Sequence, residues 1–486
     1  MTGHHRRMTA TPPEERAGTV EPPRSRRALL AGSVGNFIEW YEFGAYGYFA
    51  TIIATAFFTP EGASDVEGLV KTYASFALAF FFRPLGAALF GRVGDRVGRR
   101  PTLILVLLLM TGATTLIGVL PTYATVGAAA PWLLTSLRVL QGLSAGGEFG
   151  GAVSVMTEFA PPGRRGLYGA WQSFTVALGL LAGAGLAALL ATVLTQDQLE
   201  RWGWRVPFLL ALPLGLVALW LRLRLEETPS FRRSRPHPPP PPVPAPGPTP
   251  ARLPVEDGAA PLPRGTAGAI ALGVGRIMGW SAAGYTFLVV LPAYLQTSLN
   301  ATFRQALLAT VLANLGFAAS ILPAGALSDR IGRRAVMLTG AVLVTLLALP
   351  LLNLLQDPAA PQPVRGGAVF LAGAVVGLLA GPGPAMLAEA FPTSVRYTGL
   401  GLAYGLSNAV FSGSAGLIIT ETVEHTGSVD VPAYYAAATC AVSIPALLTL
   451  RGDAHRHRLG DRPAAGSAVG HPPPGPPNDQ EVRPCG

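Results

Sequence analysis

Long apolar segments separated by short polar stretches run through most of the chain. Twelve of these segments are long enough to cross a membrane as a helix of about 20 residues. They lie at 28–57, 70–91, 101–121, 132–157, 166–194, 204–224, 266–295, 305–327, 335–355, 366–388, 397–420 and 431–450. The pattern predicts an all-α polytopic membrane protein with 12 transmembrane helices.

A proline-rich segment divides the twelve segments into two groups of six. Residues 225–265 contain an unbroken proline run at 238–242 and clustered arginines, a composition that favours extended polyproline II. We interpret this segment as a cytoplasmic linker between two six-helix bundles, 28–224 and 266–451. The ends, 1–27 and 452–486, are rich in proline, glycine and charge, and are predicted to be disordered cytoplasmic tails.

An internal repeat supports two halves built on one plan. GRVGDRVGRR at 91–100 recurs as GALSDRIGRR at 325–334, after the second segment of each group. After the fourth segment, Glu158 and Arg165 match Glu389 and Arg396. Two similar halves with a binding site between them are typical of secondary transporters.

The basic residues fit a topology signal. The net charge is +9, yet only 13% of the 486 residues are charged and the mean hydropathy is +0.40. With the N-terminus inside, 28 of the 36 Lys and Arg residues fall in inside segments and five in outside segments. This asymmetry places both termini in the cytoplasm and accounts for the basic excess without nucleic-acid binding. The bias of 35 Arg to one Lys indicates a GC-rich bacterial genome.

The composition excludes other classes of protein. A soluble enzyme of this length would need more charge on its surface, and a disordered protein would be poorer in large apolar residues. The two cysteines, Cys440 and Cys485, form no disulfide framework, and no metal site is predicted. A phosphate-binding lysine motif and a nucleophile–base pair are also absent from the sequence. We therefore expect neither an ATP-driven pump nor an enzyme.

Several motifs carry a resemblance to a known family. The ten-residue repeat resembles the signature loop of the major facilitator superfamily. GNFIEWYEFGAYG at 35–47, RPLGA at 83–87 and RVLQGLSAGGE at 138–148 resemble helices 1, 2 and 4 of its metabolite:proton symporters. WGWRVPF at 202–208 and LEETPSF at 225–231 make the sixth helix most similar to that of the proline and glycine betaine osmoprotectant transporters. The resemblance covers about 28–450.

This resemblance implies a set of properties. They are the major facilitator fold in the lipid bilayer of the cell membrane, a small-molecule substrate, a monomer, and the proton as coupling ion with no other cofactor. The fifth helix lacks the Gly-Pro element typical of the drug–proton antiporters of the superfamily.

Charged residues inside apolar segments are functional candidates because a charge at the bilayer centre is costly. Asn36, Glu39 and Glu42 recur at i, i+3 and i+6 and share one helix face. We predict that Glu39 and Glu42 are protonatable carboxylates that couple proton flow to substrate. The alternative is a structural ion pair with Arg83 or Arg138.

A second polar face is predicted on the fourth segment, where Arg138, Gln141 and Glu148 fall within one arc. Arg138 and Glu148 join the proton-coupling candidates. Arg138 would hold either a substrate carboxylate or a deprotonated glutamate; alternatively, it makes a permanent pair that ties helices together. The substrate-binding candidates are Asn36, Arg83, Arg138, Gln141, Arg276, Tyr41 and Trp280.

Three of these candidates have specific alternatives. Arg276 would add a second cation to the cavity and favour organic anions, or it would extend towards the cytoplasm. Tyr41 and Trp280 would contact a quaternary ammonium group by cation–π interaction, or they serve as packing residues and interfacial anchors.

The repeated motifs predict a cytoplasmic gate. Glu158 and Glu389 end the fourth and tenth segments, where they would form ion pairs with the arginines of the repeated loops when the transporter faces outward. Breaking these pairs would open the inner side. The gate candidates are Asp95, Arg99, Arg100, Glu158, Asp329, Arg333, Arg334 and Glu389.

The sequence thus favours a proton symporter that imports a small metabolite bearing a carboxylate, with a zwitterionic osmolyte such as proline or glycine betaine as the first expectation. An organic acid such as 2-oxoglutarate, citrate or shikimate is the alternative substrate. A non-transporting sensor built on a transporter fold is the alternative from another class.

Overall fold

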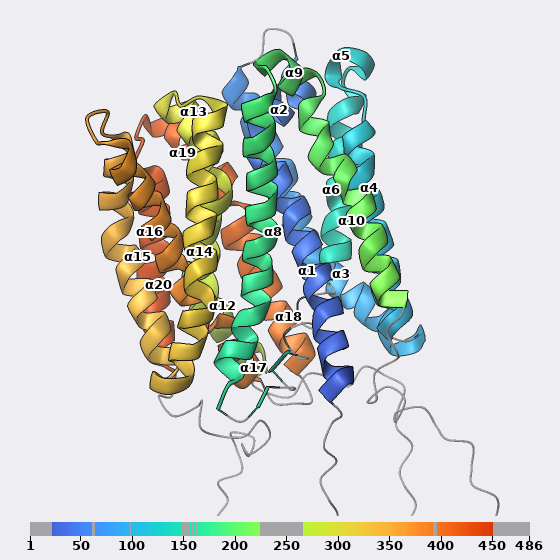
Figure 1. Cartoon of the computed structure of the whole chain (residues 1–486), viewed down its shortest axis with the longest axis vertical. Helices are drawn as coiled ribbons and strands as arrows, with labels where there is room; N and C mark the ends of the chain where they lie inside the picture. Colours follow the sequence, from blue (N-terminus) through green and yellow to red (C-terminus); the bar gives the residue numbers. More distant parts are fainter. Residues whose placement is uncertain are drawn as a thin grey trace, which may run out of the picture.

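The computed structural model describes residues 22–60, 64–97, 99–146, 163–223, 266–391 and 396–450, together with a few positions between 149 and 161. Throughout these ranges the regular structure is helical and contains no strand. The helices run roughly parallel to the long axis of the molecule (Figure 1). We call the described residues up to 223 the first half and those from 266 the second half.

The first half contains six long helices and several short ones. In chain order they are α1 (Pro22–Tyr48), α2 (Ala50–Ile53), the π-helix η1 (Ala54–Phe58), α3 (Asp65–Val97), α4 (Arg99–Val119), α5 (Tyr123–Val126), α6 (Ala129–Ala145), α8 (Arg165–Val193), α9 (Gln196–Arg201), the 3-10 helix η2 (Gly203–Arg205) and α10 (Val206–Leu223).

Helices of the second half are more often interrupted. They are α12 (Thr266–Tyr285), the π-helix η3 (Thr286–Val290), α13 (Leu291–Leu299), α14 (Phe303–Ile331), α15 (Arg333–Gln356), α16 (Gln362–Ala380), α17 (Gly383–Ala390), α18 (Arg396–Ser407), the π-helix η4 (Asn408–Gly413), α19 (Ala415–Thr426) and α20 (Val431–Leu448).

Ten helices of the described part are long and apolar enough to cross a membrane. The two other predicted segments, 28–57 and 132–157, hold α1 and α6, which do not meet this criterion. Two glutamates, Glu39 and Glu42, make α1 more polar, and α6 is described over only 17 residues. The all-α membrane fold is therefore confirmed, whereas the number of twelve helices and the cytoplasmic termini remain predictions.

Glycines allow neighbouring helices to pack closely within each half. A Cβ added at Gly86 of α3 would collide with the Leu143 carbonyl, and one at Gly142 of α6 would collide with the Ala79 carbonyl. The second half repeats the arrangement between α14 and α16, where Gly316 and Gly373 meet opposing backbone. Glycines lack a side chain and so let the backbones of two membrane helices approach closely. In lipid, van der Waals contact rather than the hydrophobic effect then holds the helices together.

The halves meet along α8 and α14, which lie side by side in the middle of the molecule (Figure 1). We call the end where α8 begins and α14 ends the lower end, and the opposite end, which carries α2 and α9, the upper end. Aromatic side chains of α1 and α3 fill the interior of the first half and surround the buried charges described next.

Candidate functional site

Arg83 of α3 and Glu39 of α1 form a buried ion pair. Arg83 Nη2 lies 3.2 Å from Glu39 Oε1, and the two side chains are only 5% and 3% exposed. The angles are not those of a hydrogen bond, and Nη2 and Nε of Arg83 have no hydrogen-bond partner in the described part of the chain. The guanidinium instead lies over the rings of Phe43 and Phe80, with its central carbon 4.4 and 4.2 Å from their centroids. Charge and cation–π contact hold this pair together.

Arg138 of α6 is connected to Glu42 through two neutral side chains. Arg138 Nη1 donates to Gln141 Oε1, Gln141 Nε2 donates to Thr114 Oγ1, and Thr114 Oγ1 lies within donating distance of Glu42 Oε2, each at 2.6 Å. All four side chains are at most 1% exposed. The result is a continuous polar chain from α6 through α4 to α1.

Aromatic rings enclose the Arg138 guanidinium as well. Its central carbon lies 4.2 Å from the ring centroid of Tyr46 and 4.9 Å from those of Phe43 and Phe76. Phe43 therefore contacts both arginines. Two guanidinium groups on one aromatic wall repel each other, so the site favours an additional negative group.

Donors without an acceptor accumulate at this site. Among the described residues, Nε and Nη2 of Arg138 find no hydrogen-bond partner, and Oε1 of Glu42 is also unpartnered. Buried polar groups are hydrogen-bonded in nearly all native structures, so an unmatched set of this kind calls for a ligand or water. A carboxylate is complementary to a guanidinium because it accepts two parallel hydrogen bonds.

Asn36 and Tyr41 hold α1 to its neighbours. Asn36 Nδ2 donates to Thr175 Oγ1 of α8 at 2.6 Å, and Tyr41 Oη donates to the Pro207 carbonyl of α10 at 2.9 Å. Trp280, the third predicted contact of substrate, packs on Tyr404 with ring centroids 5.9 Å apart. The structure thus gives Asn36 and Tyr41 helix–helix partners and brings Arg83, Arg138 and Gln141 together around the glutamates.

Arg276 of α12 contacts the end of α20. Its Nη2 donates to Thr449 Oγ1 at 2.9 Å and its Nε to the Ala446 carbonyl at 3.3 Å. A cation is favourable there because the last carbonyls of a helix carry partial negative charge. The sequence allowed a place in the cavity or one extended towards the cytoplasm; the role of Arg276 in substrate binding stays a prediction.

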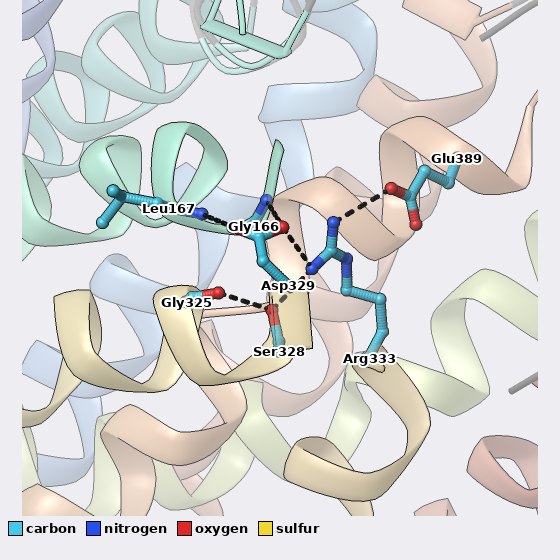
Figure 2. Close-up of polar contacts among 7 residues, drawn as sticks. All are labelled: Gly166, Leu167, Gly325, Ser328, Asp329, Arg333 and Glu389. Atoms are coloured by element: carbon cyan, nitrogen blue, oxygen red, sulfur yellow. Dashed lines mark hydrogen bonds and ion pairs between the residues drawn. The ribbon is translucent and has the colours of Figure 1, made fainter. Parts of the chain in front are cut away.

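A network of polar contacts joins the two halves at the lower end (Figure 2). Asp329 Oδ1 accepts a hydrogen bond from the Gly166 amide at 2.7 Å, and Oδ2 accepts one from the Leu167 amide at 2.9 Å. These amides belong to the first turn of α8, where backbone N–H groups have no acceptor within the helix. A carboxylate from α14 therefore caps a helix of the other half and interacts favourably with its dipole.

Arg333 extends this network within the second half. Its Nη1 donates to Asp329 Oδ1 at 2.8 Å and to Ser328 Oγ at 2.7 Å, and its Nη2 lies 3.2 Å from Glu389 Oε1 (Figure 2). Both acids and Arg333 are at most 9% exposed. Close packing accompanies the polar contacts, since a Cβ at Gly325 would collide with Ala170 of α8.

The upper end is closed by other contacts. Thr51 Oγ1 donates to Gln296 Oε1 at 3.2 Å, and the rings of Phe49 and Phe303 are 5.6 Å apart. The halves are thus in contact at both ends, and the buried arginines and glutamates lie in the interior of a closed molecule.

Replacing Asp329 with asparagine is expected to loosen the lower end. The change removes the charge that caps α8 and pairs with Arg333, and hydrogen bonds to charged groups contribute about 1.5–3 kcal/mol each. We expect the population open at the lower end to rise by ~10-fold or more. The reporter is the alkylation rate of Ser173→Cys, whose parent hydroxyl donates to the Ala380 carbonyl across the halves, with both native cysteines replaced by serine.

Asp197→Asn is the matched control for this measurement, because Asp197 forms an exposed ion pair with Arg201 within α9. In the Asp197→Asn variant, the alkylation rate of the Ser173→Cys reporter should equal the rate in the reporter protein without this change. Equal rates in the Asp329→Asn and Asp197→Asn variants would contradict a closing role for Asp329.

Five predicted site residues cannot be placed. The side chains of Asp95, Arg99, Arg100, Glu148 and Glu158 lie outside the described residues. Arg334 is described and partly buried. Within the described ranges, no cluster of three or more His, Cys, Asp or Glu side chains could hold a metal ion.

Sequence reasoning missed two residues that belong to this environment. Thr114 completes the chain between Gln141 and Glu42, but a threonine within an apolar helix carries no distinctive signal. Arg222 of α10 is 4% exposed and donates to the Leu103 carbonyl of α4 at 2.6 Å. Its position within the predicted segment 204–224 is the signal that identifies it.

Comparisons with protein families match most of the chain. The family described as Sugar (and other) transporter matches residues 28–237, and the family described as Major Facilitator Superfamily matches residues 272–473. Among curated proteins, the ectoine/proline transporter of Corynebacterium glutamicum is 35% identical, over 91% of this chain and 88% of its own.

Other curated relatives carry similar names. The proline/betaine transporter of Escherichia coli K12 is 32% identical and the glycine betaine/proline/ectoine/pipecolic acid transporter of Dickeya dadantii is 31% identical, each over 92% of this chain and 87% of its own. Among solved structures, a proton:xylose symporter bound to 6-bromo-6-deoxy-D-glucose has a TM-score of 0.70 at 18% identity, covering 88% of this chain and 95% of its own. A D-xylose–proton symporter has a TM-score of 0.67 at 19% identity, covering 87% and 97%.

Proposed function

Since this chain belongs to the major facilitator superfamily, we propose that it imports a zwitterionic osmolyte, glycine betaine or proline, together with protons. The chain is a membrane transporter and not an enzyme, as are the relatives that match it over most of its length. The names of those relatives support an osmolyte as substrate.

One observation carries the proposal: Arg138 is buried among aromatic rings with two nitrogens unpartnered in the described structure, close to an ion pair between Arg83 and Glu39. A zwitterion has the matching chemistry. Its carboxylate would pair with the guanidinium of Arg138, and its ammonium group would face the rings of Phe43, Tyr46 and Phe76.

The ion pair supplies a way to couple protons to substrate. A proton taken up by Glu39 releases Arg83, which then joins Arg138 as a partner for the substrate carboxylate. When substrate and proton leave together, Glu39 pairs with Arg83 again, as in the structure. With the proton alone bound, Arg83 is left as a buried charge without a partner, which disfavours closure of the transporter. With substrate alone bound, Glu39 keeps Arg83, and the carboxylate has only Arg138 as a partner. The polar chain through Gln141 and Thr114 connects Glu42 to Arg138.

We place the inner gate at the lower end. Opening requires Asp329 to leave the first turn of α8, and closure restores that contact. The halves that move would be the two six-helix bundles, 28–224 and 266–451, with 225–265 as the cytoplasmic linker and 1–27 and 452–486 as cytoplasmic tails.

The position of Arg276 supports an osmolyte over an organic acid. Arg276 is the cation that would favour organic anions if it lay in the cavity, and it is instead bonded to Thr449 and the Ala446 carbonyl. A non-transporting sensor would require neither the buried ion pair of Arg83 and Glu39 nor a guanidinium with unpartnered nitrogens at Arg138.

Uptake of labelled glycine betaine into proteoliposomes tests the proposal. An inward proton gradient should drive accumulation of glycine betaine or proline, and dissipating the gradient should reduce it to equilibration. Gradient-driven accumulation of 2-oxoglutarate without either osmolyte would instead support the organic-acid alternative. Transport of none of these compounds would favour the sensor.

A further inference from the structure

Tyr285 ends α12 and brings the second half into contact with the aromatic wall of the first. Its ring lies 5.4 Å from that of Phe80 in a perpendicular arrangement and 6.1 Å from those of Phe76 and Trp40. The guanidinium of Arg83 lies over the ring of Phe80, and the guanidinium of Arg138 lies over the ring of Phe76. Tyr285 therefore packs on the rings that hold both arginines, and it is within electrostatic reach of both.

The hydroxyl of Tyr285 is buried without a hydrogen-bond partner in the described structure. The side chain is 5% exposed, and Oη makes no hydrogen bond to any described residue. Two other buried tyrosines of this region are satisfied: Tyr46 Oη lies 2.6 Å from Ser75 Oγ, and Tyr48 Oη donates to the Leu180 carbonyl at 3.2 Å. The hydroxyl of Tyr73 is also without a partner among the described residues. A buried hydroxyl that is left open beside two incompletely bonded guanidinium groups indicates a missing acceptor.

The segment after Tyr285 links this position to closure between the halves. The π-helix η3 begins at Thr286, and all five of its residues are buried. π-helical turns occur often at functional sites. Val289 of η3 packs on Gly47 of α1, where an added Cβ would collide with it. A ligand that holds Tyr285 therefore acts on the segment through which the second half meets α1.

We propose that Tyr285 is a substrate-binding residue whose hydroxyl donates to the carboxylate held by Arg138, so that the carboxylate is contacted by both halves. This inference rests on the proposed function and adds to it the residue of the second half that recognises the acid group. Because the carboxylate would then be bonded by a residue of each half, a substrate without an acid group cannot join them.

Tyr285→Phe tests this inference because it removes only the hydroxyl. The KM for glycine betaine should rise by at least about ten-fold, the loss expected for a hydrogen bond to a charged group. The midpoint of thermal unfolding without substrate should not fall, since the hydroxyl has no partner in the described structure. The upward shift of that midpoint on adding glycine betaine should be reduced.

Tyr48→Phe is the matched control, since it loses a hydrogen bond to the Leu180 carbonyl and should destabilise the protein while its KM stays within about two-fold. Tyr285→His, which keeps a donor, provides a second variant and should recover part of the affinity. An unchanged KM and an unchanged substrate-induced thermal shift in Tyr285→Phe would overturn the inference. Failure of the proposed function is distinct, because the wild-type protein would then accumulate neither glycine betaine nor proline.

Discussion

Glu39→Gln is expected to abolish proton-driven accumulation while exchange of substrate across the membrane continues. Glutamine keeps the shape of glutamate but cannot carry the proton that releases Arg83. With one proton per substrate, an inward gradient of about two pH units supports roughly 100-fold accumulation, and the variant should reach only equilibration. The measurement is the steady-state ratio of labelled glycine betaine in proteoliposomes, alongside counterflow into vesicles preloaded with unlabelled substrate.

Two controls make this result interpretable. Glu421→Gln alters an exposed carboxylate that contacts His425 and should accumulate substrate normally. Breaking a buried pair from one side is destabilising by about 3–5 kcal/mol, so the double variant Glu39→Gln/Arg83→Gln removes both partners and should be more stable than the single one. Gradient-driven accumulation by Glu39→Gln would refute the coupling role of this residue, and Glu42→Gln would then be the next variant to measure.

Arg138→Lys should lower the affinity for substrate by at least ~100-fold. Lysine preserves the charge but lacks the planar fork that binds a carboxylate at two points and stacks on aromatic rings. It also cannot both donate to Gln141 and present two further nitrogens, as the arginine does. The quantity to measure is the KM for glycine betaine at a fixed proton gradient, corrected for the amount of protein in the vesicles.

Arg276→Gln is the matched control for Arg138→Lys, because it also replaces a buried arginine within an apolar helix. Its contacts lie at the end of α20, so its KM should remain within about two-fold of the wild-type value. A large rise in KM for Arg276→Gln with little change for Arg138→Lys would reverse the assignment and favour organic acids.

The hydropathy pattern predicts where helices lie better than where they end. The segment predicted at 305–327 corresponds to α14, Phe303–Ile331, which continues through Ser328 and Asp329. Hydropathy marks the apolar part of a helix, and a helix that emerges from the membrane continues with polar residues. The same difference lengthens the segment at 70–91 to α3, Asp65–Val97.

The candidate site was predictable where it consists of charges in apolar segments. Glu39, Glu42, Arg83 and Arg138 stand out because such charges are rare, and the sequence already allowed a pair between Glu39 and Arg83. Gln141 was predicted on the same helix face as Arg138. Thr114 was not predictable, because its contact with Gln141 depends on how α4 packs on α6. The bonds from Asp329 to the first turn of α8 also escaped prediction, since backbone amides leave no trace in a sequence.

The three π-helices bear on how this chain should be aligned with its relatives. A π-turn accommodates one residue more than the α-helix around it, which rotates everything beyond it by about 100°. Below η3, α12 packs on α18 and α20, whereas η3 and α13 pack on α1 and α14. A one-residue gap within 286–290 would thus change which face the upper part of this helix presents, without breaking the helix. Positions on either side of each π-helix are best compared between sequences as independent blocks.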